Sequence, residues 1–291
     1  MKTKPKFPTR LNGLAKNKTQ SKHPNLWDGL QGLWMPSTGV QGMGIQDISN
    51  HNNHASLNFM TAADWQGDGL ESDGFNDYAL VDNGEADLTT DVDFSVSLWV
   101  HYQGGGNGNG VFMAKEINGI AAPFNLKRKD QQLKISMKLG NGTTETESTA
   151  IGMTITDDWV LVTSTVRKTA TDTYEVKIYK NDRLIGTSSV SQAINTTGDE
   201  VTFFSNVAKT EDYAGIQDHM AIWNRVLSHQ EIMSMYAGAS PVIKRKQTVG
   251  FVAAVGGSVI KTFNGLANAS TKTWGGLANA SIKTLNGVSN V

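Results

Sequence analysis

The stretch that decides the fold is FSVSLWV, residues Phe94–Val100. Phe, Val, Leu and Val occupy every second position, and Ser95, Ser97 and Trp99 stand between them. Because successive side chains of a strand point to opposite faces of a sheet, this alternation indicates a β-strand with a buried face. The stretch LKISMKL at residues 133–139 has the same period, with lysine and serine on its second face.

Further alternating runs follow at residues 160–166 and 176–178, and turn residues separate them. Many short strands divided by turns predict an all-β sandwich or barrel. One helix is expected after the last strand, because Ser228 and Glu231 have the spacing of a capping box and Gly238 can end the helix. The turn signals are the glycine-rich segment 104–110 and the pairs Asn141-Gly142, Asn181-Asp182 and Gly198-Asp199.

Composition divides the chain of 291 residues into three predicted parts. Residues 1–26 form a basic, extended N-terminal arm, 27–238 form the sandwich, and 239–291 form a repeat-containing docking or assembly segment. Residues 1–27 hold seven Lys and Arg, and 232–291 hold six, with no acid in either segment. All 27 acidic residues therefore lie between them. Basic ends on an acidic body suggest docking on an acidic partner, and the alternative is a pair of solvated tails.

Five motifs occur in an order that resembles the concanavalin A-like lectin/glucanase superfamily, which includes laminin-G-like (LamG) domains. Asn50, Asn52 and Ala55 stand where that family usually has glycine. The resemblance implies a concanavalin A-like jelly-roll sandwich with one short helix after the last core strand, plus extended N- and C-terminal arms. The motifs are GLW (32–34) with DISNHNNH (47–54), DGFNDY (73–78), FSVSLWV (94–100), Trp159 with KIYKND (177–182), and GIQDHMAIWNRVLS (215–228).

No arrangement of residues predicts catalysis. Family members that cleave glucans carry Glu-x-Asp-x-x-Glu on one strand, which places two carboxylates across the scissile bond. This pattern is absent, and the nearest candidates, Glu145 and Glu147, are expected on a solvated strand face. The six histidines form no helical ligand pair, and without cysteine a structural zinc site is not expected. We therefore expect a binding or structural protein and no enzyme.

Calcium is the one cofactor that the resemblance suggests. Relatives often carry Ca²⁺ near the opening turn and the last strand, where this chain has Asp47 and Asp218. Turn carbonyl groups can supply several of the six to eight oxygens that calcium needs. The alternative is that Asp47 caps its own turn and Asp218 pairs with a base.

Carbohydrate binding is likewise an expectation from the family resemblance. A sugar site needs aromatic platforms beside polar groups on an exposed face. The predicted glycan contacts are Tyr102, Asn107 and Asn109. Tyr102 stands beside a glycine-rich rim loop, and the two asparagines lie in that loop. The alternative for any one of the aromatic residues is a place in the core of the sandwich.

The C-terminal segment repeats with a period of 11 residues. KTFNGLANAS at 261–270 recurs as KTWGGLANAS at 272–281 and, decayed, as KTLNGVSN at 283–290; RLNGLAKN at 10–17 echoes it. Asn-Gly and Gly-Gly indicate turns, so each repeat is expected to give a short extended piece with an aromatic residue or Leu before the turn and Leu or Val after it. One repeat cannot bury its own apolar residues. The predicted partner contacts are Leu14, Phe263, Leu266, Trp274, Leu277 and Leu285.

The tails and the segment Trp27–Trp34 also resemble accessory proteins of phage particles. The first hypothesis is therefore a non-enzymatic virion protein, a capsid decoration or fibre-like protein. Its sandwich would face outward to bind host-surface glycans, and its arms would anchor on capsid proteins or copies of itself. The alternative is a carbohydrate-binding module of a cell-surface or secreted protein. No apolar stretch follows the basic N-terminus, so we expect no signal peptide, no membrane segment and a virion protein made in the host cytoplasm. Nucleic acid is not an expected partner, because the basic residues are sparse.

Overall fold

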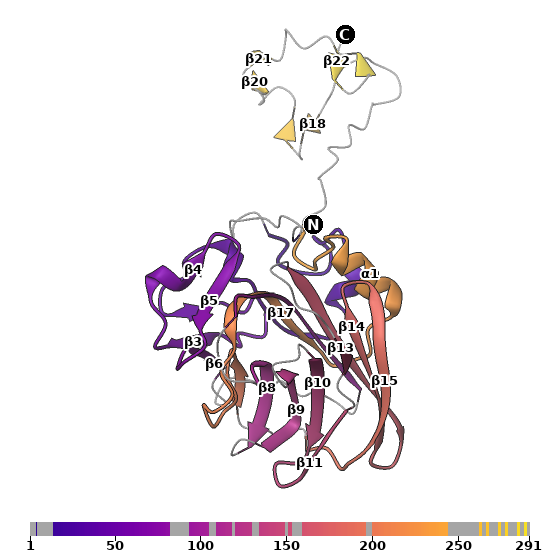
Figure 1. Ribbon diagram of the computed structural model, residues 1–291. Helices are drawn as coiled ribbons and strands as arrows, with labels where there is room; N and C mark the ends of the chain where they lie inside the picture. The colour runs from indigo at the N-terminus through magenta and orange to yellow at the C-terminus, as the bar shows by residue number, and fades with distance from the viewer. Residues whose placement is uncertain are drawn as a thin grey trace. The chain divides into compact units, whose positions relative to one another are not determined.

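The structure is a computed structural model, and it describes most of the first 243 residues (Figure 1). The chain divides into two compact units, 1–245 and 246–291, which are described separately. The described residues are 4, 14–81, 93–104, 109–117, 120–129, 134–148, 151–152, 159–195 and 200–243, with six two-residue strands between 262 and 289.

The first unit is an antiparallel sandwich of two sheets, which confirms the predicted all-β fold. Sheet I has eight strands in the order β15-β14-β13-β7-β17-β5-β4, and β1 also pairs with β17. The strand FSVSLWV forms most of β7, between β13 and β17 at the centre of this sheet. The bounds are β1 (Leu30–Trp34), β4 (Trp65–Gln66), β5 (Gly69–Asp73), β7 (Phe94–Tyr102), β13 (Val160–Ala170), β14 (Thr173–Lys180), β15 (Arg183–Ser191) and β17 (Ala214–Trp223).

Sheet II has nine strands in the order β11-β10-β9-β8-β16-β6-β3-β2, and β12 also pairs with β10. The bounds are β2 (Gly44–Ile45), β3 (Ala55–Asn58), β6 (Tyr78–Val81), β8 (Val111–Ile117), β9 (Ile120–Lys129), β10 (Lys134–Gly140), β11 (Glu145–Glu147), β12 (Ile151–Gly152) and β16 (Glu200–Phe203). Among the described residues, three short 3-10 helices lie in the connections near the N-terminal end: η2 (Pro24–Trp27), η3 (Pro36–Thr38) and η4 (Ala62–Asp64).

The main core lies between the sheets and follows the period of two read from the sequence. Val96 and Leu98 of β7 lie in one buried cluster with Phe124 and Leu126 of β9. At the opening turn, Asn50 and Asn52 adopt left-handed φ angles of 75° and 60°, and Asn is one of the few residues other than glycine that adopts them readily. The departures from glycine at these two positions therefore leave the fold intact.

A second apolar cluster covers the outer face of sheet I. Helix α1 (His229–Tyr236) begins at the predicted capping box, in which Ser228 accepts from the backbone of Glu231 and the Glu231 side chain accepts in return. The helix packs Ile232 and Met235 into this cluster. Its other members include Leu14, Leu26, Leu33, Trp99, Leu161, Trp223 and Val242.

Residues near both described ends of the first unit, Leu14 and Val242 among them, belong to this second apolar cluster. The sandwich therefore extends beyond the predicted bounds of 27 and 238. The backbone amide of Ala15 donates to the carbonyl of Val242 at 2.7 Å, and that of Lys22 donates to Ile243 at 2.7 Å. Residues 14–26 were expected in the extended arm, and 239–243 in the tail. Both segments instead close the outer face of sheet I, because burial of their apolar side chains is favourable.

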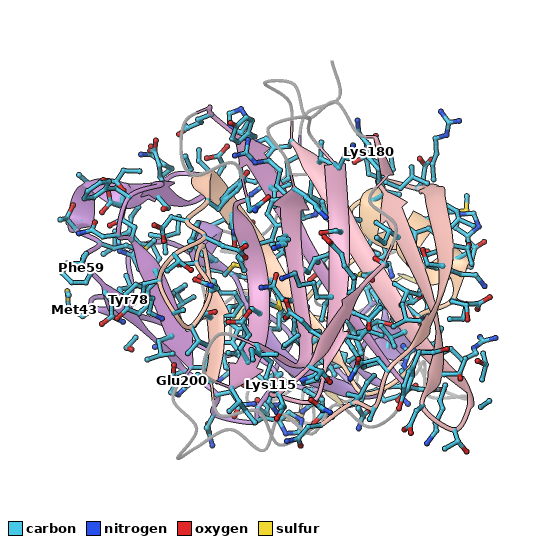
Figure 2. All side chains as sticks on the ribbon, turned by 60° about the horizontal axis from the view of Figure 1, so that its bottom comes forward. Met43, Phe59, Tyr78, Lys115, Lys180 and Glu200 are labelled. Carbon is cyan, nitrogen blue, oxygen red and sulfur yellow. The ribbon has the colours of Figure 1, made fainter. Side chains whose placement is uncertain are left out.

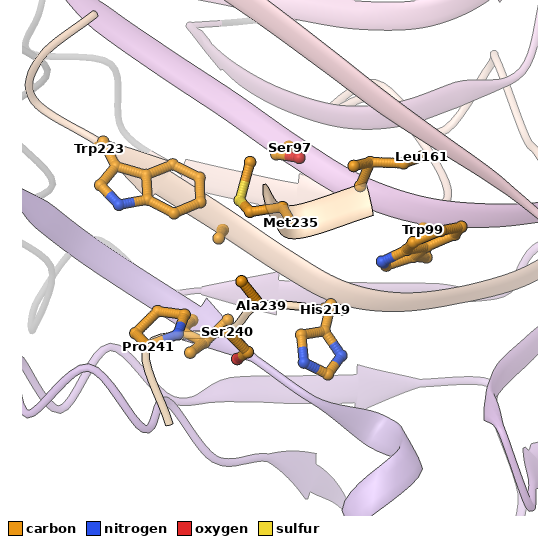
Figure 3. Close-up of a pocket in the computed structure, with 11 residues that line it drawn as sticks. Ser97, Trp99, Leu161, His219, Trp223, Met235, Ala239, Ser240 and Pro241 are labelled. Atoms are coloured by element: carbon orange, nitrogen blue, oxygen red, sulfur yellow. The ribbon is translucent and has the colours of Figure 1, made fainter. Parts of the chain in front are cut away.

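A small cavity remains beneath α1, with a volume of about 20 Å³, enough for one water molecule. Met235 reaches between Trp99 and Trp223 on one side of it, and His219 lies on the other side with Ser240 (Figure 3). Such a cavity leaves no room for a sugar or a cofactor. No helix among the described residues is long and apolar enough to cross a membrane.

Among its described residues, the second unit contains three two-stranded hairpins, one in each repeat. The predicted Asn-Gly or Gly-Gly turn falls between the two strands of each hairpin, with Phe, Trp or Leu before it and Leu or Val after it. The pairs are β18 (Thr262–Phe263) with β19 (Leu266–Ala267), β20 (Thr273–Trp274) with β21 (Leu277–Ala278), and β22 (Thr284–Leu285) with β23 (Val288–Ser289).

Candidate functional site

Asp47, one of the two predicted calcium ligands, caps the turn in which it lies. Its Oδ1 accepts the backbone N–H groups of Leu33 at 3.0 Å and Ser49 at 2.8 Å. Its Oδ2 accepts the N–H of Asn53 at 3.0 Å and the Ser49 hydroxyl at 2.8 Å. His54 supports the same turn, because its Nδ1 accepts the Asp47 N–H at 3.0 Å. Four donors thus occupy the acceptor positions of this carboxylate.

Asp218, the second predicted ligand, is fully buried in an ion pair. Its Oδ2 lies 2.7 Å from Nζ of Lys4 and 3.0 Å from Nδ1 of His219, and its Oδ1 accepts the N–H of Ser37 at 3.0 Å. Burial alone would raise the pKa of the Asp218 carboxyl, but the Lys4 ammonium and His219 outweigh burial and hold that pKa below its ordinary value.

These donors do not fit a calcium site. Calcium requires six to eight oxygen ligands, whereas both carboxylates here are occupied by N–H, O–H and ammonium donors. Across the part of the chain that the structure describes, no group of three or more His, Asp and Glu side chains could hold a metal ion. The structure matches the turn cap and the ion pair that were the alternatives to calcium.

The predicted glycan contacts do not form an open platform. The guanidinium carbon of Arg128 lies 4.2 Å from the centre of the Tyr102 ring, and the Tyr213 ring lies 6.1 Å away. Tyr102 is therefore half-buried against the core. Asn109 is partly exposed and makes contacts of its own, and Asn107 lies outside the described residues.

The predicted partner contacts fall into two groups. Leu14 is 2 % exposed inside the second apolar cluster, so its side chain is used within the chain and cannot meet a partner. Phe263, Leu266, Trp274, Leu277 and Leu285 lie on strands of the three hairpins. The backbone places each of these five beside the turn of its repeat, as the repeat pattern predicts.

The outer face of sheet II is polar, in contrast to the apolar outer face of sheet I. One register row crosses this sheet and carries mostly polar side chains. Inward-facing neighbours such as Leu57, Phe124 and Met137 belong to the core. The row consists of Ser56, Leu80, Thr202, Ala114, Asn125, Lys138 and Glu147.

Ion pairs organise the charged half of this face. Nζ of Lys127 lies 2.8 and 3.0 Å from the two carboxylate oxygens of Glu211, which comes from the loop between β16 and β17. Lys129 pairs with Glu147, and Lys138 pairs with Glu145. The carboxylates of Glu145 and Glu147 are therefore held by lysines, in place of the solvated strand face expected from the sequence.

Glu116 is the most buried carboxyl of the face, with 0 % exposure. Its Oε1 accepts from Asn125 Nδ2 at 2.6 Å, and its Oε2 accepts from the N–H of Val207 at 3.0 Å. Burial raises the pKa of Glu116, although both hydrogen bonds oppose this effect. The loop that supplies Val207 and Glu211 covers this part of the sheet. The Glu116 carboxylate therefore stabilises the fold by holding this loop through the N–H of Val207.

Exposed aromatic surface lies at the other end of the face, at the β3–β6 edge. Phe59 is 68 % exposed and Met43 is 70 % exposed, and both lie beside Tyr78 at one margin of the molecule (Figure 2). The Phe59 and Tyr78 ring centres are 6.3 Å apart, and Nζ of Lys209 lies 3.7 Å from the centre of the Tyr78 ring. The buried Nδ2 of Asn58 has no hydrogen-bond partner among the described residues. We call Met43, Asn58, Phe59, Tyr78 and Lys209 the aromatic edge.

The backbone holds Phe59 outward in a costly conformation. Its φ is +62°, a left-handed angle that bulky residues rarely adopt. Strain of this kind costs roughly 1–3 kcal/mol and persists where the surrounding structure enforces it, often at binding sites. The turn buries Met60, at 3 % exposure, and leaves the larger ring of Phe59 in solvent.

Sequence reasoning missed Phe59, because alternation along Leu57-Asn58-Phe59 places its side chain inside. A left-handed φ at a phenylalanine has no signature in the sequence. Tyr78 could have been found, since it ends the motif DGFNDY that carries the family resemblance.

The fold now has a family. Residues 73–233, more than half of the chain, match the model of the concanavalin A-like lectin/glucanases superfamily. The chain belongs to this superfamily. Comparison with curated protein sequences gives no match.

Solved structures similar to this chain include botulinum neurotoxin receptor-binding domains. That of botulinum neurotoxin D has a TM-score of 0.54 at 14 % identity, over 73 % of this chain and 53 % of that chain. A type C structure, described with cell entry that depends on two ganglioside molecules, has a TM-score of 0.51 at 16 % identity, over 73 % and 52 %. The binding domain of neurotoxin DC in complex with SialylT has a TM-score of 0.50 at 14 % identity, over 72 % and 51 %. This chain spans about half the length of these chains, and at such identities the likeness shows the fold alone.

Proposed function

We propose that this chain is a non-enzymatic, lectin-like glycan-binding protein whose binding surface is the aromatic edge. The observation that carries the proposal is Phe59, a large ring held in solvent by a left-handed backbone. An exposed aromatic ring in a strained position needs a reason, and a sugar supplies one. The C–H groups on one face of a pyranose ring are apolar and pack on an aromatic ring, where they leave water.

Polar groups around Phe59 can supply the hydrogen bonds that a sugar needs. Asn58, directly before Phe59, is partly exposed, and a side-chain amide exchanges hydrogen bonds with hydroxyl groups. Lys209 lies over Tyr78, and burial lowers the pKa of its ammonium group, although Glu200 and Glu116 oppose this. One aromatic platform with a few convergent polar groups is typical of carbohydrate sites. The likeness in fold to neurotoxin domains described with gangliosides or with SialylT supports a glycan as the ligand class.

We propose no catalytic role for the face. A glycosidase needs one protonated and one ionised carboxyl group on opposite sides of a bond. Among the described residues, Lys138 and Lys129 occupy the carboxylates of Glu145 and Glu147, and Asn125 and the N–H of Val207 occupy that of Glu116. These pairings suit a stable charged surface and leave none of these three carboxyl groups free for acid catalysis.

For its biological setting we propose a virion accessory protein, a capsid decoration or fibre-like protein. Three hairpins that repeat every 11 residues support this role, because two-stranded pieces are marginal alone and gain stability by pairing with a partner. The basic C-terminal segment would dock on other virion proteins or on copies of this chain. The alternative is a carbohydrate-binding module of a cell-surface or secreted protein, which would use the same aromatic edge.

Two measurements test these proposals. Binding of the purified chain to an array of neutral and sialylated glycans tests the lectin function, and binding to none of them would contradict it.

Light scattering of the full chain and of residues 1–245 tests the assembly role. We expect a defined oligomer for the full chain and a monomer for the shorter one. Equal monomeric masses would exclude self-assembly through the hairpins.

A further inference from the structure

Lys4 is the one described residue of the first 13, and its side chain is only 7 % exposed. Its ammonium group meets three different groups of the sandwich. Nζ lies 2.7 Å from Oδ2 of Asp218, donates to the backbone carbonyl of Asp68, and lies 4.1 Å from the centre of the Trp159 ring. A carboxylate, a carbonyl and an aromatic face together suit a primary ammonium group, which is a compact charge with three donors.

The walls of this pocket are held by contacts other than those to Lys4. Ser37 donates its N–H to Oδ1 of Asp218 at 3.0 Å, which fixes the carboxylate. The Trp159 indole N–H donates to Oδ2 of Asp68 at 3.1 Å, and His101 lies against the Trp159 ring at 5.5 Å. The pocket is therefore built by the sandwich itself, and the lysine fills it.

The occupant comes from a different part of the chain from the walls. The walls span β17, the turn before β5, and the residue before β13, whereas Lys4 stands ten residues before Leu14. Asp218 is 0 % exposed, so its carboxylate needs a cation to offset the cost of burial. This site lies on sheet I and shares none of its residues with the aromatic edge of sheet II.

We propose that Asp218, Trp159 and the Asp68 carbonyl form a binding site for a primary alkylammonium group, and that the N-terminal arm docks on the sandwich by inserting Lys4 there. The ammonium group has two sources with the same chemistry, the arm of the same chain and the arm of a second copy. Exchange of an arm between copies keeps every contact of the site and is a common route to dimers. The site thus gives the basic arm a specific docking point on an acidic body.

The first experiment replaces the ammonium group and then returns it as a free probe. Lys4→Met keeps the length of the side chain and removes the charge. We expect the Tm to fall by at least about 6 °C, because a buried carboxylate loses its partner. Lys4→Ala also removes the ammonium group and leaves its side-chain space open, so addition of n-butylammonium should restore part of the lost Tm in this variant and leave the wild type unchanged. Tetramethylammonium, which has no N–H donor, should restore less.

The response must depend on the walls of the pocket. In Lys4→Ala/Asp218→Asn the effect of n-butylammonium should disappear. If the double variant does not fold, Lys4→Ala/Trp159→Leu replaces it, with a weakened response expected. An unchanged Tm in Lys4→Met overturns the proposal. So does an equal response to n-butylammonium in variants with and without the wall residue.

A titration of His219 separates charge recognition from simple packing. Burial lowers the pKa of His219, Asp218 opposes this, and the Lys4 charge lowers the pKa further. Removal of that charge in Lys4→Ala should therefore raise the pKa of His219, measured by NMR, and n-butylammonium should lower it again. A pKa that is the same in both proteins would show that Lys4 contributes no charge at this site.

Mixing experiments distinguish the two sources of the ammonium group. Lys4→Met retains the pocket, and Asp218→Asn retains the lysine. If arms cross between copies, light scattering of the mixture should show an assembly of higher mass than either variant forms alone. If the arm docks on its own chain, the mixture keeps the masses of the separate variants and the wild type keeps its higher Tm at every dilution.

Discussion

The two outer faces of the sandwich differ in polarity: the outer face of sheet I is apolar, and that of sheet II is polar and charged. Sheet I presents Trp99, Leu161 and Trp223, and helix α1 and the chain ends cover them. Sheet II presents lysines and glutamates joined in ion pairs, and the β16–β17 loop covers part of it. The first face thus completes the core, whereas the second is polar, with Asn125, Lys127 and Thr202 buried and Lys138 and Glu147 partly exposed.

This difference separates stability from function. An apolar face must be buried, so residues 14–26 and 239–243 are recruited to sheet I by the hydrophobic effect. A polar face can stay in water, and there Phe59 is an exception, because a large ring is exposed where burial is usual. Substitutions on the two faces should therefore have different consequences.

Trp223→Ala should have the largest effect on stability. The ring is 1 % exposed, and its indole N–H donates to the Leu26 carbonyl at 2.9 Å. Loss of the buried ring and of its hydrogen bond should lower the free energy of unfolding by about 3–5 kcal/mol, measured by urea denaturation. A loss below about 1 kcal/mol would contradict a buried outer face on sheet I.

Leu14→Ala should have the next largest effect on the free energy of unfolding. This leucine is 2 % exposed in the cluster that the chain ends close. We expect the free energy of unfolding to fall by about 2–3 kcal/mol, and denaturant titration will measure it. The control is Leu184→Ala, at a leucine of β15 that is 46 % exposed, where the change should stay within about 0.5 kcal/mol. Equal effects would mean that Leu14 is not packed.

Glu231→Gln should show a pH-dependent loss. Burial alone would raise the pKa of Glu231, but Arg225 and the Ser228 backbone lower it from 4.5 to about 2. The ionised carboxylate therefore adds stability above its unfolded pKa, and this is lost as pH falls from about 4.5 through about 2. The variant should be less stable by roughly 0.5–1 kcal/mol at pH 7, with the difference vanishing near pH 2 in urea titrations. A difference independent of pH would rule out the ion pair as its cause.

A glycine at position 59 should relieve strain. At a φ of +62°, glycine is strain-free where alanine is not, so Phe59→Gly should be more stable than Phe59→Ala by about 1 kcal/mol. Both substitutions remove the ring, which makes alanine the matched control for its loss. Thermal unfolding of the pair measures the difference. An alanine variant as stable as the glycine variant would argue against a left-handed Phe59.

The sequence was informative where a period or a turn determines structure. Alternation in β7 and β10, the capping box at Ser228 and Glu231, and the turns of the 11-residue repeats all have local causes. The motifs also identified the superfamily, because their order along the chain depends on the fold as a whole.

The residues of the proposed binding site could not be predicted in the same way. Phe59 is exposed because of one backbone angle, and Tyr102 is half-buried because Arg128 and Tyr213 pack against it. Asp218 was assigned to calcium on family resemblance alone, whereas the structure places Lys4, 214 residues away in sequence, on its carboxylate. Such long-range contacts leave no local pattern.

The measurement that tests the central claim most directly compares three proteins on one glycan array. The three proteins are the wild type, Phe59→Ala and Leu184→Ala. Each variant loses one exposed apolar side chain: Phe59 follows β3 of sheet II, and Leu184 lies on β15 of sheet I. The proposed binding surface predicts that wild type and Leu184→Ala bind the same glycans and that Phe59→Ala loses at least about tenfold in affinity, the equivalent of 1.4 kcal/mol. Equal binding by Phe59→Ala and wild type would contradict the assignment of the aromatic edge as the glycan site.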